Sequence, residues 1–136
     1  MIYIHRGKIY KNIRENSFKG FKLSINQGFN VETDVHFIKN NTPVCFHDFN
    51  LKRLKKVNKK IKNLNQNDLK KFKIIKLKTL IKLLKKETRL LVEIKPFLDK
   101  KKIYILNIKK IYYTFKNIKL KKTKKSKDLI IENILN

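Results

Sequence analysis

Short apolar segments alternate with longer polar and amphipathic stretches over the first 95 residues of the chain. Runs rich in Ile, Val, Leu and Phe are typical of strands buried in a parallel sheet. Such runs predict strands at residues 2–4, 29–35, 44–46 and 90–94. Within 29–35 the side chains alternate, so Glu32 and Asp34 should share one face and Val31, Thr33 and Val35 the other.

Two stretches between these segments have the spacing of amphipathic helices. In residues 15–27, Phe18, Phe21 and Ile25 recur at helical intervals, and Gly28 ends the pattern. In residues 79–87, Thr79 is a candidate N-cap ahead of a leucine stripe formed by Leu80, Leu83 and Leu84. The Lys- and Asn-rich residues 50–77 are expected to be irregular, with one helical turn at 68–72.

Strands separated by helices predict right-handed βαβ units and a parallel sheet, which is an α/β fold. Beyond residue 95 the spacing of Ile and Tyr predicts a helix at 105–112, followed by a charge run and a short apolar stretch at 129–135. We therefore divide the chain into residues 1–95, which carry the candidate chemistry, and a Lys-rich helical tail at 96–136.

Polar side chains stand at the carboxyl ends of all four predicted strands. In a (β/α) barrel this is the face that carries the chemistry. The residues are His5, Glu32, Asp34, His47, Glu93 and Lys95.

Three of the ten acidic residues lie inside apolar, strand-like segments: Glu32, Asp34 and Glu93. A buried carboxylate is costly unless it is paired or bound to a metal. Three oxygen donors without cysteine favour Mg²⁺ or Ca²⁺ over zinc. The alternative is simple ion pairing with some of the 36 Lys and Arg residues.

Two histidines at strand ends, His5 and His47, can serve as general acid and base across a phosphodiester. Arg6 and Lys95 offer positive charge for phosphate oxygens, and Lys95 shares a face with Glu93. We expect His36 to point away from the acid pair and to be structural.

The formal net charge of +26 comes from lysines spread along the chain and accompanies an excess of Ile and Asn. We interpret this charge as drift in amino-acid composition on a solvated surface, with attraction of anionic substrates as a side effect. Specific nucleic-acid binding is not expected, and membrane contact would be peripheral. Cys45 is the single cysteine, so no intramolecular disulfide can form. No signal peptide or membrane span is evident, which favours a cytoplasmic protein.

A set of ordered motifs resembles the glycerophosphodiester phosphodiesterase family over residues 1–95. The motifs are HRG at 5–7, EN at 15–16, ETDV at 32–35, PVCFHD at 43–48 with Leu51 and Arg53, TL at 79–80 and VEIK at 92–95. Their order and spacing both match, although Asn40 and Asn41 replace the usual Asp-Gly turn.

The resemblance implies a TIM barrel and a metal-dependent hydrolase that converts glycerophosphodiesters to glycerol 3-phosphate and an alcohol. By similarity, carboxylates would bind Ca²⁺ or Mg²⁺, histidines would transfer protons, and cations would hold the substrate phosphate. These roles fall on Glu32, Asp34 and Glu93 for the metal, His5 and His47 for catalysis, Arg6 and Lys95 for phosphate, and Glu15 and Asn16 as supporting residues.

A TIM barrel usually needs about 250 residues, so this chain is expected to form about the first half of one. A truncated gene, association with itself or a second chain, and an open half-barrel are the alternatives. The function would then be that of the enzyme, of a non-catalytic remnant or subunit, or of a basic anion-binding protein.

Overall fold

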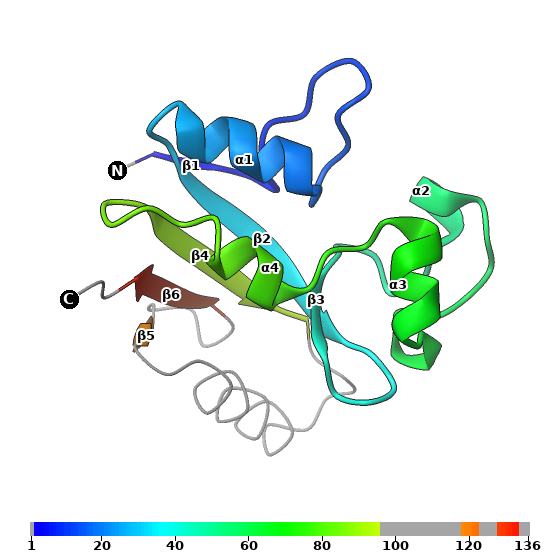
Figure 1. The fold of residues 1–136 in the computed structure, drawn as a ribbon. Coiled ribbons are helices and arrows are strands. Elements are labelled where there is room, and N and C mark those ends of the chain that lie inside the picture. The colour runs from blue at the N-terminus through cyan, green and yellow to red at the C-terminus, as the bar shows by residue number, and fades with distance from the viewer. Residues whose placement is uncertain (1, 96–117, 123–127, 134–136) are drawn as a thin grey trace.

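The computed structural model of this chain describes residues 2–95, 118–122 and 128–133 (Figure 1). Its centre is β2 (Asn30–Phe37), which pairs in parallel with β1 (Tyr3–Ile4) and with β4 (Arg89–Ile94). Helical segments connect these three strands, as the alternation of apolar and amphipathic segments predicts. The parallel register places Asp34 opposite Glu93.

The third strand, β3 (Pro43–Cys45), runs antiparallel to β2 rather than parallel to it. Cys45 pairs with Val35, and the backbone N–H of Phe46 donates to the carbonyl of Asp34 over 3.0 Å. The prediction of a wholly parallel sheet is wrong here, because the turn between β2 and β3 is too short for a crossover. Instead, the hairpin folds the chain back beside the acid pair.

Two further strands extend the sheet beyond β4. β6 (Asp128–Asn133) pairs antiparallel with β4, and β5 (Ile118–Lys122) pairs antiparallel with β6. The apolar stretch predicted at 129–135 thus falls largely within a strand. In these two segments the expected helical tail is replaced by sheet, while the helix predicted at 105–112 lies outside the described residues.

The first helix, α1 (Phe18–Asn26), covers one face of the sheet (Figure 1). Its N-cap is Ser17, whose side chain accepts a hydrogen bond from the backbone N–H of Gly20. Phe21 and Ile25 are buried, as the helical spacing predicts, and belong to the same core cluster as Val31.

The second predicted helix is shorter and begins earlier than expected. α4 (Leu77–Ile81) has Lys76 at its N-cap, so Thr79 lies within the helix and does not cap it. After Ile81 the chain continues in tight turns, in which Leu83 and Leu84 donate to carbonyls three residues back. Leu80 and Leu84 nevertheless lie in the core cluster that covers one face of the sheet, and Leu83 packs against it.

Residues 50–77 contain more helix than the sequence pattern predicts. They form α2 (Lys52–Lys55), a 3₁₀ turn η1 (Ile61–Asn63) and α3 (Gln66–Phe72). Asn65 and Asp68 make a capping box at the start of α3. Apolar residues of this segment join Ile38, Val44 and Phe46 in a second core cluster. No helix among the described residues is long and apolar enough to cross a membrane.

The two faces of β2 and β4 differ in chemistry. The face beneath α1 and α4 is apolar, and it includes Val31, Val35, Leu90, Val92 and Ile94. The opposite face carries the acidic residues of both strands. Strand alternation thus separates the packed core from the candidate site.

Gly7 and Gly28 provide a matched pair for testing the turn after β1. Both have positive φ angles, of 71° and 81°, but a Cβ at Gly7 would lie 2.9 Å from Phe21 Cδ1, while Gly28 has open space. We expect Gly28→Ala to cost roughly 1 kcal/mol of unfolding free energy from backbone strain. Gly7→Ala should cost a further 1–3 kcal/mol, approximately, from overpacking. Equal costs in chemical denaturation would contradict this account.

Candidate active site

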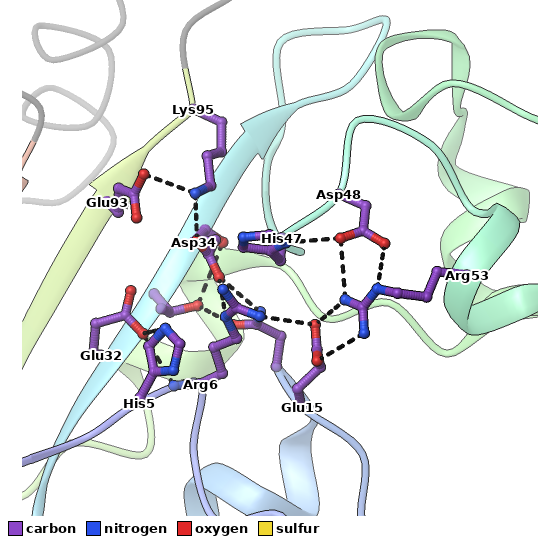
Figure 2. A network of polar contacts seen from close by, with 12 residues as sticks. His5, Arg6, Glu15, Glu32, Asp34, His47, Asp48, Arg53, Glu93 and Lys95 are labelled. Carbon is purple, nitrogen blue, oxygen red and sulfur yellow. Dashed lines mark hydrogen bonds and ion pairs between the residues drawn. The ribbon is translucent and has the colours of Figure 1, made fainter.

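The polar residues predicted at the strand ends gather on one side of the sheet (Figure 2). The carboxylates of Glu32, Asp34 and Glu93 each present an oxygen within 4.8 Å of the others. Glu32 and Asp34 lie two residues apart on β2, and Glu93 comes from the neighbouring β4 in parallel register. The predicted acid cluster therefore forms, because strand alternation and register act together.

Asp34 lies at the centre of this cluster and its side chain is fully buried. Lys95 Nζ lies 2.8 Å from its Oδ1, Arg6 Nε lies 3.0 Å from its Oδ2, and Asn16 Nδ2 donates to Oδ2 over 3.2 Å. Burial alone would raise the pKa of Asp34. The contact and charge of Lys95, with Asn16 and Arg6, outweigh burial and hold that pKa below its usual value.

The two ion pairs of Asp34 are close but poorly directed. Within the described residues, neither Asp34 Oδ1 nor Arg6 Nε has an aligned hydrogen-bond partner, although Lys95 Nζ and Asp34 Oδ2 lie at ion-pair distance from them. Lys95 and Arg6 nevertheless compensate the charge of this carboxylate. The three carboxylates of the cluster offer only oxygen ligands, and such a donor set fits a divalent metal.

Glu32 experiences the opposite electrostatic balance from Asp34. Its Oε2 accepts a hydrogen bond from the backbone N–H of Arg6 over 3.0 Å, and His5 Nε2 lies 3.8 Å away. Burial, followed by the charge of Asp34, raises the pKa of Glu32 to about 7 despite the contact with Arg6. Positive charge is thus scarce beside Glu32, and a divalent cation held there would supply it.

The backbone of the HRG segment is bent to make the contact with Glu32. Arg6 has a φ of 56° and Gly7 a φ of 71°, so two successive residues adopt left-handed conformations. Such a conformation is costly for a residue with a side chain. In return, the same residue contributes its backbone N–H to Glu32 and its guanidinium to Asp34.

Lys95 bridges Asp34 on β2 and Glu93 on β4. Its Nζ donates to Glu93 Oε1 over 2.7 Å and lies 2.8 Å from Asp34 Oδ1. Burial would lower the pKa of Lys95, but its contacts with the two carboxylates outweigh burial and raise that pKa. Lys95 therefore remains charged beside the acid cluster.

His47 lies at the point where the β2–β3 hairpin returns to the acid pair (Figure 2). Its Nδ1 lies 2.7 Å from Asp48 Oδ1. Asp48 in turn accepts two hydrogen bonds from Arg53, at 2.7 and 3.0 Å. The hydrogen bonds from Arg53, followed by the contact with His47, outweigh burial and lower the pKa of Asp48 to about 2.

Arg53 also binds Glu15, with Nη2 and Nη1 donating to its carboxylate oxygens over 2.5 and 3.1 Å. Glu15 Oε1 lies 3.5 Å from Arg6 Nη1, so one chain of contacts links His47 to Arg6. Glu15, His47 and Asp48 also form a group that could hold a metal. There the Arg53 guanidinium already supplies the compensating charge.

Asn16 is buried and contacts two residues of β2 beside the cluster. It donates to Asp34 and accepts a hydrogen bond from Thr33 Oγ1 over 2.7 Å. His5 is different, because its side chain is two-thirds exposed at the edge of the cluster. The structure thus brings all nine predicted site residues to one region, with His5 at its margin.

Two residues of this network received no role from the sequence. Asp48 directly follows His47, and Arg53 lies five residues farther along, in α2. The PVCFHD motif with Arg53 could have suggested a role, but their pairing with Glu15 depends on the tertiary fold. Arg53 and Glu15 are 38 positions apart, so neither motif alone predicts their contact.

His36 differs from its prediction in orientation. Alternation along the continuous β2 strand places residues 32, 34 and 36 on one face, so the expectation that it points away from Asp34 is wrong. Its ring is buried, and Nε2 lies 3.0 Å from the backbone carbonyl of His47. Burial lowers the pKa of His36 and favours the neutral ring.

The model of the glycerophosphoryl diester phosphodiesterase family matches residues 5–134. This chain belongs to that family. The match extends past the residues 1–95 whose motifs carry the resemblance in sequence. A comparison with curated proteins found no match.

Solved phosphodiesterase structures support the family assignment. A glycerophosphodiester phosphodiesterase from Thermotoga maritima is 28% identical, with a TM-score of 0.68, over 85% of this chain and 50% of its own. A phosphodiesterase from Oleispira antarctica, solved with sn-glycerol-3-phosphate, is 26% identical with a TM-score of 0.58, over 68% and 43%. The chain spans about half the length of these relatives, and the predicted α/β, TIM-barrel-like fold is confirmed.

The raised pKa of Glu32 predicts a pH-dependent difference in stability. A carboxyl with a folded-state pKa of about 7 and an ordinary value of 4.5 contributes fully below pH 4.5, and this contribution is lost as pH rises through 7. In protein freed of metal by chelation, Glu32→Gln should therefore gain stability over the parent at pH 8, on the order of 2–3 kcal/mol. Denaturation at pH 4.5 and pH 8 measures this gain, and a pH-independent difference would contradict it.

Proposed function

We propose that this chain carries the active site of a metal-dependent hydrolase that cleaves glycerophosphodiesters to glycerol 3-phosphate and an alcohol. The observation that supports it most directly is the convergence of Glu32, Asp34 and Glu93 from two paired strands. The sn-glycerol-3-phosphate described as the product in the Oleispira antarctica relative agrees with this reaction.

Glu32, Asp34 and Glu93 would hold a divalent cation, Ca²⁺ or Mg²⁺, because carboxylate oxygens are the ligands that hard cations prefer. When bound, such an ion polarises a phosphoryl oxygen and stabilises the negative charge that develops in the transition state. Burial, followed by the charge of Asp34, raises the pKa of Glu32, and the charge of the cation would oppose both effects.

Arg6 and Lys95 would bind the non-bridging oxygens of the phosphodiester. Both cations are held beside the acid cluster by Asp34, and Lys95 also by Glu93. Fixed cations stabilise developing negative charge without reorganising during the reaction. Their contacts with acids keep them in position.

His47 and His5 would transfer the protons. With Nδ1 of His47 held by Asp48, Nε2 is the ring nitrogen that exchanges a proton with the substrate. One histidine would accept the proton of the nucleophile, and the other would donate a proton to the leaving alcohol. Asp48 would fix the tautomer of His47, and Arg53 would hold Asp48 in place.

Glu15 and Asn16 would act as supporting residues. Glu15 connects the guanidinium groups of Arg6 and Arg53, and Asn16 donates to Asp34. Their loop therefore joins the phosphate-binding side of the site to the His47 side.

Glu32→Gln tests the metal site. Loss of one carboxylate should abolish both stabilisation by Ca²⁺ or Mg²⁺ and turnover of glycerophosphocholine, because the cation loses a charged ligand. Thermal shift with each cation and a glycerol 3-phosphate assay measure the two effects. Glu87→Gln, a change at an exposed acid outside the cluster, is the matched control. Unchanged cation affinity in Glu32→Gln would refute the assignment.

Asp48→Asn tests the positioning of His47. The amide keeps the shape of Asp48 but loses the charge that orients the ring, so kcat should fall by about 10–100-fold with little change in KM. An unchanged kcat, or a rise in KM as large as the fall in kcat, would contradict a positioning role for Asp48.

A further inference from the structure

A cleft of about 530 Å³ opens between the loop that precedes α1 and the segment from α2 to α3. Its lining includes Glu15 and Asn16, which also belong to the candidate active site. Buried apolar side chains, among them Ile13, Phe46 and Ile74, form its inner wall. The cleft therefore adjoins the proposed reaction centre, and nothing in the proposed mechanism occupies it.

The charged residues that line the cleft are mostly cations. They are Arg14, Lys19, Lys55 and Lys73, which come from three separate segments of the chain. The one acidic residue among the lining residues is Glu15, and Arg53 binds both of its carboxylate oxygens. The cleft thus has a net positive charge that its own lining does not neutralise.

Lys55 shows that these cations are close enough to affect one another. It is half-buried at the end of α2, unlike most lysines among residues 2–95, which are exposed. Burial, followed by the charges of Arg14 and Lys73, lowers the pKa of Lys55. A basic surface that is merely solvated avoids this cost, because exposed lysines separate and are screened by salt. A bound anion would relieve the repulsion.

The cleft walls also suggest the chemistry of the ligand. Lysine and arginine side chains bind phosphate groups, and an apolar wall packs against carbon atoms. We propose that the cleft binds a second phosphate group, carried by the alcohol portion of the glycerophosphodiester. This inference rests on the proposed function, because the shared residues Glu15 and Asn16 place the cleft beside the reacting phosphate. Preferred substrates would then have a phosphorylated alcohol rather than a cationic one such as choline.

Binding of inorganic pyrophosphate to the full chain, followed by calorimetry, tests the cleft without any turnover. The double variant Lys55→Gln/Lys73→Gln should weaken binding by about tenfold for each lost charge. Lys22→Gln/Lys78→Gln removes the same charge from exposed positions outside the cleft and should bind like the parent. Lys95→Gln, which alters the proposed reaction centre, should retain the binding.

Two results would overturn the inference. One is equal weakening in the cleft and control double variants, which would mean that only net charge matters. The other is binding that disappears in Lys95→Gln and persists in the cleft double variant. A Tm measurement without anion guards against misfolding, since loss of cation repulsion should leave the Tm of the cleft variant unchanged or higher.

A substrate comparison tests the link to the reaction. The measured quantity is the ratio of kcat/KM for glycerophosphoglycerol phosphate to that for glycerophosphoglycerol. The ratio should exceed one in the parent and fall by about tenfold or more in Lys55→Gln/Lys73→Gln. An unchanged ratio would refute the role in substrate choice. Absence of turnover for every diester would refute the proposed function, while the pyrophosphate titration would still decide whether the cleft binds phosphate.

Discussion

The buried carboxylate of Asp34 is the constraint on which the rest of the site depends. An ionised group removed from water must be compensated by charge and hydrogen bonds from its surroundings. Here the compensation comes from the turn after β1, the loop before α1 and the end of β4, through Arg6, Asn16 and Lys95. The connection between β1 and α1 and the end of β4, which are distant in sequence, are thereby held at one edge of the sheet.

Glu32 is less well compensated than Asp34. Two residues away on the same strand, it receives a backbone N–H but no close cation comparable to those of Asp34. The two carboxylates therefore differ in pKa in opposite directions. Neighbouring acids with separated pKa values occur often at functional sites, where burial and nearby charges shift the two groups in different directions. The asymmetry favours an added divalent charge over simple ion pairing.

Much of this site could be predicted from the sequence because it depends on short-range rules. Alternation in β2 places Glu32 and Asp34 on one face, and parallel pairing with β4 adds Glu93. The same rules also apply to His36, and they correct its predicted orientation. Helix boundaries were less predictable. Thr79 has the chemistry of a cap, but α4 begins at Leu77, whose side chain is buried in the core.

Features that depend on long-range contacts were beyond the sequence. The pairing of Arg53 with Glu15 and Asp48, for example, requires the loop before α1 to lie against α2. Charge patterns along the chain contain no record of that proximity. The direction of β3 is a different case, because the segment between the two predicted strands is too short for a parallel crossover, and that length is visible in the sequence.

The β2–β3 hairpin has a consequence for how the family can vary in length. His47 reaches the acid pair through the turn at residues 39–42 and a strand paired residue by residue with β2. One residue added within β3 would reverse the facing of every later side chain in that strand and turn the imidazole away. Residues added in the turns after Arg53 would leave the hairpin and its pairing with β2 unchanged. Insertions among relatives should therefore accumulate between α2 and α4, while the hairpin keeps a constant length.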